Sequence, residues 1–235
     1  MCFHVVYECV YRKKGLNMTN VSEKQLTRRQ RERLAHMNEV LEAAEECFLQ
    51  KGYRDATIED IAKKADFAVG SIYTFYKNKE ELLCHVVLRI ANKQIDDFNE
   101  CVMPLLENPI AALEALTKLW CEHAIKYGDF LRMSYTVRHV DSIGTMTKPT
   151  AVKLSPLNQE IREAFAEFRT KELSVFEKAI EKNLTCDLSA DELSIVFEGV
   201  AHNYMIKCML RKIEPTVKSA TADLLKIYKT LFLKK

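Results

Sequence analysis

The sequence has few of the residues that interrupt helices. Its 235 residues include only six glycines and five prolines, and long stretches contain neither. Folds rich in β-strands need many tight turns, so this scarcity argues against them and favours helices. No run approaches the ~18 consecutive apolar residues that a membrane-spanning helix requires. With 48% hydrophobic and 29% charged residues, the composition predicts a soluble, all-α protein without membrane contact.

The eight cysteines show no spacing typical of a metal or redox site. There is no C-x-x-C pair and no histidine at ligand spacing from a cysteine. Scattered thiols on apolar helix faces usually behave as small hydrophobic residues, with a zinc or redox site as the alternative. We expect no metal and no cofactor, and reduced thiols indicate a cytoplasmic protein. The cysteines are residues 2, 9, 47, 84, 101, 121, 186 and 208.

The charge balance and the missing catalytic motifs exclude the simplest functional classes. The chain has 35 basic and 33 acidic residues, and the resulting net charge of +2 does not by itself indicate nucleic-acid binding. The sequence lacks the G-x-S-x-G, H-E-x-x-H, P-loop and Rossmann signatures. We therefore expect no catalytic residues, and a helical enzyme is the less favoured alternative.

The first seventeen residues differ from the rest. An apolar run precedes the basic cluster Arg12–Lys14, which reverses the order found in a secretory signal. We expect the functional chain to begin near Met18 and residues 1–17 to form a poorly ordered extension.

Helical periodicity extends over the rest of the chain, with apolar residues recurring at steps of three and four. Gly52 is expected to end the first helix. Thr57 and Ser189 begin segments with the spacing of capping boxes, and Ser155-Pro156 has the pattern of another helix start. The expected nine helices cover about 29–51, 58–65, 69–76, 80–101, 109–126, 128–140, 155–183, 189–212 and 215 onward.

The first three helices have the order of a helix-turn-helix. A long helix precedes two short ones joined by a tight turn, and the second short helix would enter a major groove. About eight residues give a helix ~12 Å long, which matches a groove ~12 Å wide. Its exposed face is expected to carry Ser71, Thr74 and Phe75, with Tyr73 and Tyr76 partly buried. Basic residues flank it at Lys24, Arg28, Arg29, Arg31, Arg33, Lys63, Lys64, Lys77 and Lys79.

Several residues at fixed offsets resemble a known signature. Gly52-Tyr53, Thr57–Ala62, Gly70–Tyr76 and Lys79–Leu83 look like the DNA-binding signature of the TetR (tetracycline-repressor) family. The resemblance covers about residues 29–90. It implies a one-component transcription factor, usually a repressor, that binds a near-palindromic operator as a homodimer. A small ligand in its C-terminal domain would release it from double-stranded DNA.

The resemblance also implies which residues meet DNA. Phosphate contacts are expected from Thr57, Tyr73 and Lys79, and base contacts from Val69, Ser71 and Thr74. The alternative is that the tyrosines only pack the core and that the basic arm is a solvated helix start. The complete expected set is Arg28, Arg29, Thr57, Ala68, Val69, Gly70, Ser71, Tyr73, Thr74, Phe75, Tyr76, Lys77 and Lys79.

Three positions depart from the family pattern. Asp66 and Ala68 replace a usual glycine and a usual serine or threonine in the turn. Asp tolerates the left-handed backbone, but Ala68 cannot cap the recognition helix, which forgoes roughly 0.5–2 kcal/mol. Phe75 stands where the family usually has a residue that donates a hydrogen bond to a phosphate, and phenylalanine has no donor. Because no arginine lies on the recognition face, specificity would depend on hydroxyls, methyl contacts and DNA shape.

The C-terminal helices are rich in aromatic residues and methionines, which typically line apolar cavities. The alternative is an ordinary hydrophobic core, in which His123 is a structural residue. The residues expected to bind a small apolar or amphipathic effector are Trp120, His123, Tyr127, Phe130, Met133, Phe165, Phe168, Phe197 and Met205.

The sequence therefore predicts an N-terminal three-helix helix-turn-helix domain (18–78) and a C-terminal six-helix ligand-binding and dimerisation domain (79–235). The helix at 79–101 would link them, and the last two helices would form the homodimer. Apolar Ile195, Ile206 and Met209 lie off the stripe that one monomer can bury. The other reading is a DNA-binding protein without a small-molecule effector, either architectural or controlled by a partner.

Overall fold

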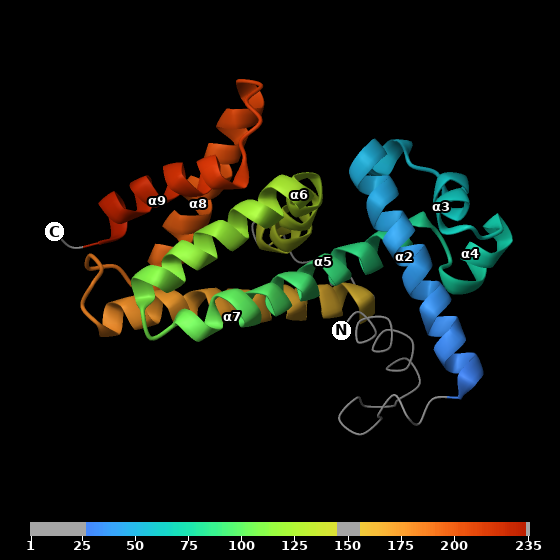
Figure 1. The fold of residues 1–235 in the computed structure, drawn as a ribbon, viewed down its shortest axis with the longest axis horizontal. Helices are drawn as coiled ribbons and strands as arrows, with labels where there is room; N and C mark the ends of the chain where they lie inside the picture. Colours follow the sequence, from blue (N-terminus) through green and yellow to red (C-terminus); the bar gives the residue numbers. More distant parts are fainter. Residues whose placement is uncertain (1–26, 145–155, 234–235) are drawn as a thin grey trace. The chain divides into compact units, whose positions relative to one another are not determined.

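The chain is mostly helical in the part that the computed structural model describes, residues 27–144 and 156–233, with side chains at 27–128 and 159–233. The prediction of an all-α fold is confirmed. The expected extension at 1–17 and the helix start at Ser155 lie outside the described residues. The elements (Figure 1) are α2 (Arg28–Asp55), α3 (Ile58–Ala65), α4 (Val69–Phe75), α5 (Lys79–Cys101), η4 (Met103–Leu105), α6 (Pro109–Gly144), α7 (Pro156–Glu181), α8 (Ala190–Leu210) and α9 (Val217–Phe232).

The structure divides into two compact units. The first contains α2 to α4 and α5 as far as residue 92, with residues 139–144 of α6 and 156–162 of α7. The second contains the remainder of α5, α6 and α7 together with α8 and α9. Helix α5 continues from one unit into the other, whereas the predicted boundary at 78/79 stays a prediction. No helix in the described ranges combines the length and apolar character needed to cross a membrane.

Local signals in the first unit act as the sequence predicted. Gly52 has φ 77° and ψ 160°, which interrupts the helical backbone of α2 three residues before its end. Thr57 caps α3 by accepting from the backbone N–H of Asp60, whose carboxylate accepts from the backbone N–H of Thr57 in return. Asp66 takes the left-handed conformation with φ 59°. Ala68 makes no side-chain cap at the start of α4.

Helix α6 differs from the prediction of two helices at 109–126 and 128–140. It is one element of 36 residues in which Tyr127 leaves the helical conformation, with φ −118° and ψ 18°. The predicted boundary between two helices is therefore a kink within one helix. Helix α9 begins after Thr216, whose hydroxyl caps it, and not at Pro215. The described chain has eight α-helices where nine were expected.

The core of the second unit is a chain of aromatic rings. Phe197 stacks on Tyr228 with ring centres 4.7 Å apart, and Tyr228 stacks on Phe232 at 5.1 Å. Phe176 meets Phe197 and Phe232 edge-on, at 5.8 and 6.1 Å. The buried Tyr228 hydroxyl donates to the Phe197 carbonyl at 2.8 Å, so its only polar atom is satisfied. These rings hold α7, α8 and α9 together.

Candidate DNA interface and effector site

Two buried anchors fix the orientation of α4. Ile72 is fully buried, and Tyr76, just after the helix, is 2% exposed. The Tyr76 hydroxyl donates to the backbone carbonyl of Met37 in α2 at 3.0 Å, and its ring meets His85 of α5 edge-on at 5.2 Å. Tyr76 therefore packs the end of α4 between α2 and α5. Among its predicted roles, the structure supports the core-packing alternative.

The anchors determine which face of α4 points outward. Gly70 and the side chains of Tyr73 and Thr74 are exposed, and Tyr73 leaves 52% of its surface accessible. These three residues are the outward face of α4. The expectation that Tyr73 is partly buried was wrong. Each helical residue advances about 100°, so Tyr73 follows the inward Ile72 away from the core.

Phe75 faces inward, contrary to expectation. It is half-buried, and its ring meets Phe67 edge-on with centroids 6.1 Å apart and lies 6.5 Å from the ring of His36. Phe75 follows Ile72 by three positions, which places both on the same side of the helix. Its aromatic side chain stabilises the packing of α4 against α2.

Arg33 holds the C-terminal end of α4. Its guanidinium donates to the backbone carbonyl of Thr74 at 3.0 Å and lies over the Phe75 ring, 5.1 Å from the centroid. The last carbonyls of a helix lack partners within the helix, and a cation is favourable at that end. From the sequence, Arg33 was expected only as one of the basic residues that flank α4. Its contact with Thr74 spans 41 residues, so no local pattern could reveal it.

Lys79 is also engaged within the protein. Its ammonium donates to the carbonyls of Ala56 at 2.6 Å and Arg54 at 3.2 Å. It also lies 4.6 Å from the centre of the Tyr53 ring. These contacts tie the start of α5 to the end of α2. The role expected for Lys79 at a phosphate stays a prediction, and contact there requires its ammonium to exchange partners.

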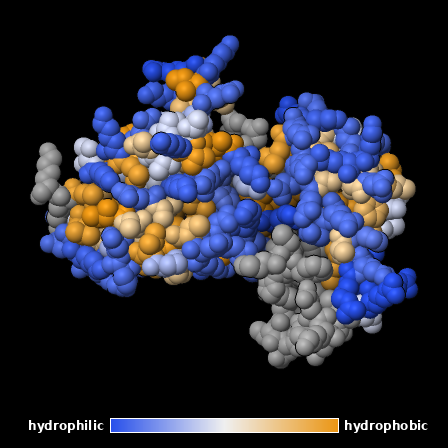
Figure 2. All heavy atoms as spheres, in the orientation of Figure 1, coloured by the Kyte–Doolittle hydropathy of each residue, from blue (hydrophilic) through white to orange (hydrophobic). Residues whose placement is uncertain are grey.

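Basic side chains remain exposed around the outward face of α4. Arg28, Arg29 and Lys77 are exposed, although Arg28 pairs with Glu32 at 2.7 Å. The N-terminal end of α2 carries the most hydrophilic spheres of this unit in Figure 2. Thr57 is exposed too, although its oxygen accepts from the backbone N–H of Asp60 and its hydroxyl bonds to the Asp60 carboxylate. Exposed donors of this kind can contact phosphates.

The comparison with known families concerns part of this unit. Residues 40–86 match the family model described as bacterial regulatory proteins, tetR family. This segment, which includes α3 and α4, is therefore similar to the DNA-binding domain of TetR-family regulators. An uncharacterised HTH-type transcriptional regulator of Bacillus subtilis, YhgD, is 37% identical over 89 residues, which make up 37% of this chain and 47% of that protein. The chain spans about half the length of the curated relatives it matches.

Solved structures of TetR-type regulators share the fold. A TetR transcription regulator from Haloarcula marismortui matches with a TM-score of 0.62 at 14% identity, covering 84% of this chain and 98% of that one. The transcriptional regulator FadR from Bacillus subtilis, solved in complex with stearoyl-CoA, matches with a TM-score of 0.54 at 18% identity. That match covers 80% of this chain and 95% of FadR.

The residues expected to bind an effector are mostly buried in the second unit. Trp120, His123 and Tyr127 lie at spacings of three and four on α6 and are at most 7% exposed. Phe165 and Phe168 of α7 are buried, with Phe168 edge-on to Phe98 at 6.1 Å. The remaining candidates differ: Phe197 belongs to the aromatic core, Met205 is half-buried, and the side chains of Phe130 and Met133 lie outside the described residues.

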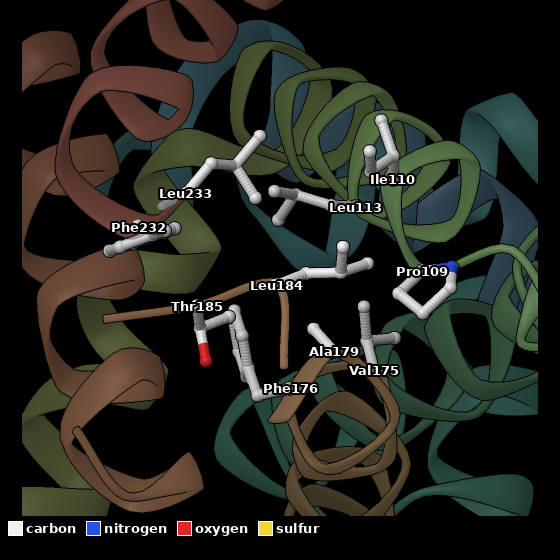
Figure 3. Close-up of a pocket in the computed structure, with 10 residues that line it drawn as sticks. All are labelled: Pro109, Ile110, Leu113, Val175, Phe176, Ala179, Leu184, Thr185, Phe232 and Leu233. Atoms are coloured by element: carbon white, nitrogen blue, oxygen red, sulfur yellow. The ribbon is translucent and has the colours of Figure 1, made fainter. Parts of the chain in front are cut away.

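A small apolar pocket lies elsewhere in this unit (Figure 3). It has room for about one water molecule and contains none of the expected effector residues. Its size does not suit an effector. It is lined by Pro109, Ile110, Leu113, Val175, Phe176, Ala179, Leu184, Thr185, Phe232 and Leu233.

His123 is a buried polar group among these apolar residues. Its Nε2 lies 2.9 Å from Oδ2 of Asp97, and the other carboxylate oxygen of Asp97 accepts from Lys93 at 2.9 Å. Burial lowers the pKa of His123, with Asp97 opposing this effect. Burial also acts to raise the pKa of Asp97, but hydrogen bonds from Lys93 and His123 outweigh it and lower that pKa. No group of three potential metal ligands occurs within the described ranges.

The last two helices expose apolar side chains. The stripe predicted on α8 turns inward, with Leu193, Phe197 and Ala201 fully buried. Apolar residues outside this stripe are exposed, and Figure 2 shows a hydrophobic group where α8 passes toward α9. These exposed residues are the α8–α9 surface: Ile195, Ile206, Met209, Leu210, Ile213, Ile227 and Leu231.

Proposed function

We propose that the chain is a sequence-specific transcriptional regulator that binds operator DNA as a homodimer in the cytoplasm and responds to a small effector, most simply as a repressor. The observation that carries the proposal is the outward face of α4. Ile72 and Tyr76 bury the opposite face, which leaves Gly70, Tyr73 and Thr74 exposed in the segment that matches the TetR-family model. An exposed face on a rigidly anchored short helix suits insertion into a major groove.

The contacts at DNA follow from the available donors and acceptors. Tyr73, Thr57 and Lys77 would donate to phosphates. The Thr74 hydroxyl already donates to the Ser71 carbonyl at 2.7 Å, so its oxygen is left to accept from a base amino group. Val69 would contact a thymine methyl group. Sequence specificity would then come from the Thr74 oxygen as a hydrogen-bond acceptor, from apolar contacts and from DNA shape. It would not involve the common contact between an arginine and a guanine.

The homodimer would form through the α8–α9 surface. Seven exposed apolar side chains lie on α8, on α9 and in the segment between them, which is typical of a protein–protein contact. A homodimer would carry two copies of α4, one for each half-site of a duplex. Half-sites one helical turn apart, ~34–36 Å, would then be read on a near-palindromic operator.

An amphipathic effector would act through α5. FadR of the same fold is solved with stearoyl-CoA, which makes an acyl-type effector the first class to examine. Helix α5 continues from the DNA-binding unit into the second unit. An effector that favours one position of α5 would change operator affinity by a coupling of typically about 1–3 kcal/mol.

Selection of random duplexes by the purified full-length chain tests the proposal. We expect enrichment of a near-palindrome with half-sites about one turn apart and a steep decrease of affinity with salt. The same sample should sediment as a dimer. Enrichment of no sequence, or binding by a monomer to a single half-site, would contradict the proposal.

A further inference from the structure

Of the two imidazole nitrogens of His123, one has a hydrogen-bond partner and the other has none among the described residues. The side chain is 3% exposed, so water does not reach it freely. Nε2 contacts Asp97 at 2.9 Å, but Nδ1 has no hydrogen-bond partner among the described residues. Buried polar atoms in folded proteins are almost always paired, and each exception calls for an explanation such as a missing ligand or water.

Asp97 determines which nitrogen carries the proton. Lys93 lies 2.9 Å from the other carboxylate oxygen and helps to hold the pKa of Asp97 below its usual value. An ionised carboxylate can only accept, so the hydrogen atom must reside on Nε2 of His123. Burial disfavours a second proton on the ring. Nδ1 is therefore left as a bare lone pair that can accept a hydrogen bond.

Aromatic residues lie one turn before and one turn after His123 on α6. Tyr127, one turn further along α6, lies 5.5 Å from the imidazole centre, and Trp120 is buried one turn before it. The α6 backbone kinks at Tyr127. The next residue, Gly128, is half-buried, and a Cβ added there would meet none of the described atoms within 4 Å. The charged groups acting on His123 are Asp97, Lys93 and Glu122.

We propose that Nδ1 of His123 accepts a hydrogen bond from the effector, whose polar group is a hydroxyl or amide N–H on an apolar body. The inference rests on the proposed effector response and defines the chemistry of its ligand. A free carboxylate does not fit this position because it has no proton to donate. It would also face a nitrogen lone pair with Asp97 and Glu122 close by.

Two isomeric probes test whether the ligand must donate a hydrogen bond. 1-Decanol donates a hydrogen bond, whereas methyl nonyl ether has the same atoms and no donor. Binding to the full chain is followed by the fluorescence of Trp120, the single tryptophan. We expect the alcohol to bind about tenfold more tightly than the ether, the change given by one buried hydrogen bond. Decanoate should bind more weakly than the alcohol.

Variants of His123 and Asp97 test whether the tighter binding of the alcohol depends on Nδ1. His123→Phe should remove the preference for the alcohol. Asp97→Asn should shrink it, because an amide can also donate to Nε2 and shift the proton to Nδ1. His202→Phe is the control, since His202 meets the Trp120 ring at 5.3 Å but its own Nδ1 already contacts the Glu198 carbonyl. The control should keep the tenfold preference.

Equal binding of alcohol and ether, tighter binding of decanoate, or no binding of any probe at saturation would each overturn the proposal. Nitrogen NMR of the labelled imidazole gives a test without ligand, with the proton expected on Nε2. A proton on Nδ1 would also overturn it. Operator binding is measured on the same preparation, so failure of this inference and failure of the DNA-binding proposal are distinguishable.

Discussion

The two units of the molecule differ in whether their polar side chains are all paired. At α4 in the first unit, the buried Tyr76 hydroxyl donates to the Met37 carbonyl, and the exposed Arg33 donates to the Thr74 carbonyl. In the second unit, the buried hydroxyls of Tyr228 and Ser194 also connect helices, but Nδ1 of His123 has no hydrogen-bond partner among the described residues. The contacts of the first unit specify one position of the recognition helix. In the second unit, our proposal assigns the unpaired nitrogen to the effector.

The predictions that succeeded in the first unit concern local signals. Capping at Thr57, the left-handed Asp66 and the break at Gly52 depend on neighbours within a few residues, so local patterns suffice. The contacts of Arg33 and Lys79 join residues 23 to 41 positions apart. Only the folded chain shows that these cations are engaged.

The aromatic residues of the second unit could not be separated into core and effector site from the sequence. Phe197 and Trp120 are both buried and both lie on helical faces. Only the fold shows that Phe197 stacks in the α7–α9 core, whereas Trp120 meets the ring of His202 edge-on at 5.3 Å. Helical periodicity predicts which face of a helix is buried, but it does not predict which residues of the other helices that face contacts.

The largest expected effect comes from removing the anchor of α4. Tyr76→Ala should destabilise the first unit by about 3–5 kcal/mol, because a buried aromatic ring and its contacts are lost. Urea unfolding followed by circular dichroism measures this change. Tyr76→Phe is the matched control and should lose about 1 kcal/mol, the contribution of one hydrogen bond. If both variants unfold like the wild type, Tyr76 is not an anchor.

Arg33→Gln should weaken operator binding about threefold to tenfold, because the end of α4 loses a hydrogen bond and a stacked cation. The slope of affinity against salt should stay the same. Arg29→Gln is the control for a phosphate contact and should reduce that slope by about 0.9. A reduced slope in Arg33→Gln would show that Arg33 meets DNA and does not position α4.

Ala68→Ser should stabilise the first unit by about 0.5–2 kcal/mol by supplying the missing cap of α4. Thermal unfolding with Ala68→Gly as the comparison measures the gain. Equal stability of the serine and alanine forms would mean that the backbone at this turn does not permit the cap.

The smallest effect concerns pH. A hydrogen bond from Lys51, together with the cap at Thr57, lowers the pKa of Asp60 to about 2 from 3.8. Since the folded pKa is the lower one, this stabilisation is complete above pH 3.8 and disappears as the pH falls through about 2. Asp60→Asn should flatten this part of the stability profile. Asp97→Asn provides the same comparison for the second unit.

The central claim is that the outward face of α4 meets DNA, and crosslinking tests it most directly. A benzophenone side chain replaces Tyr73 on the outward face or His202 on α8, and each protein is irradiated with the selected duplex. We predict that position 73 attaches to DNA and position 202 does not. Attachment at 202 without attachment at 73 would contradict the claim.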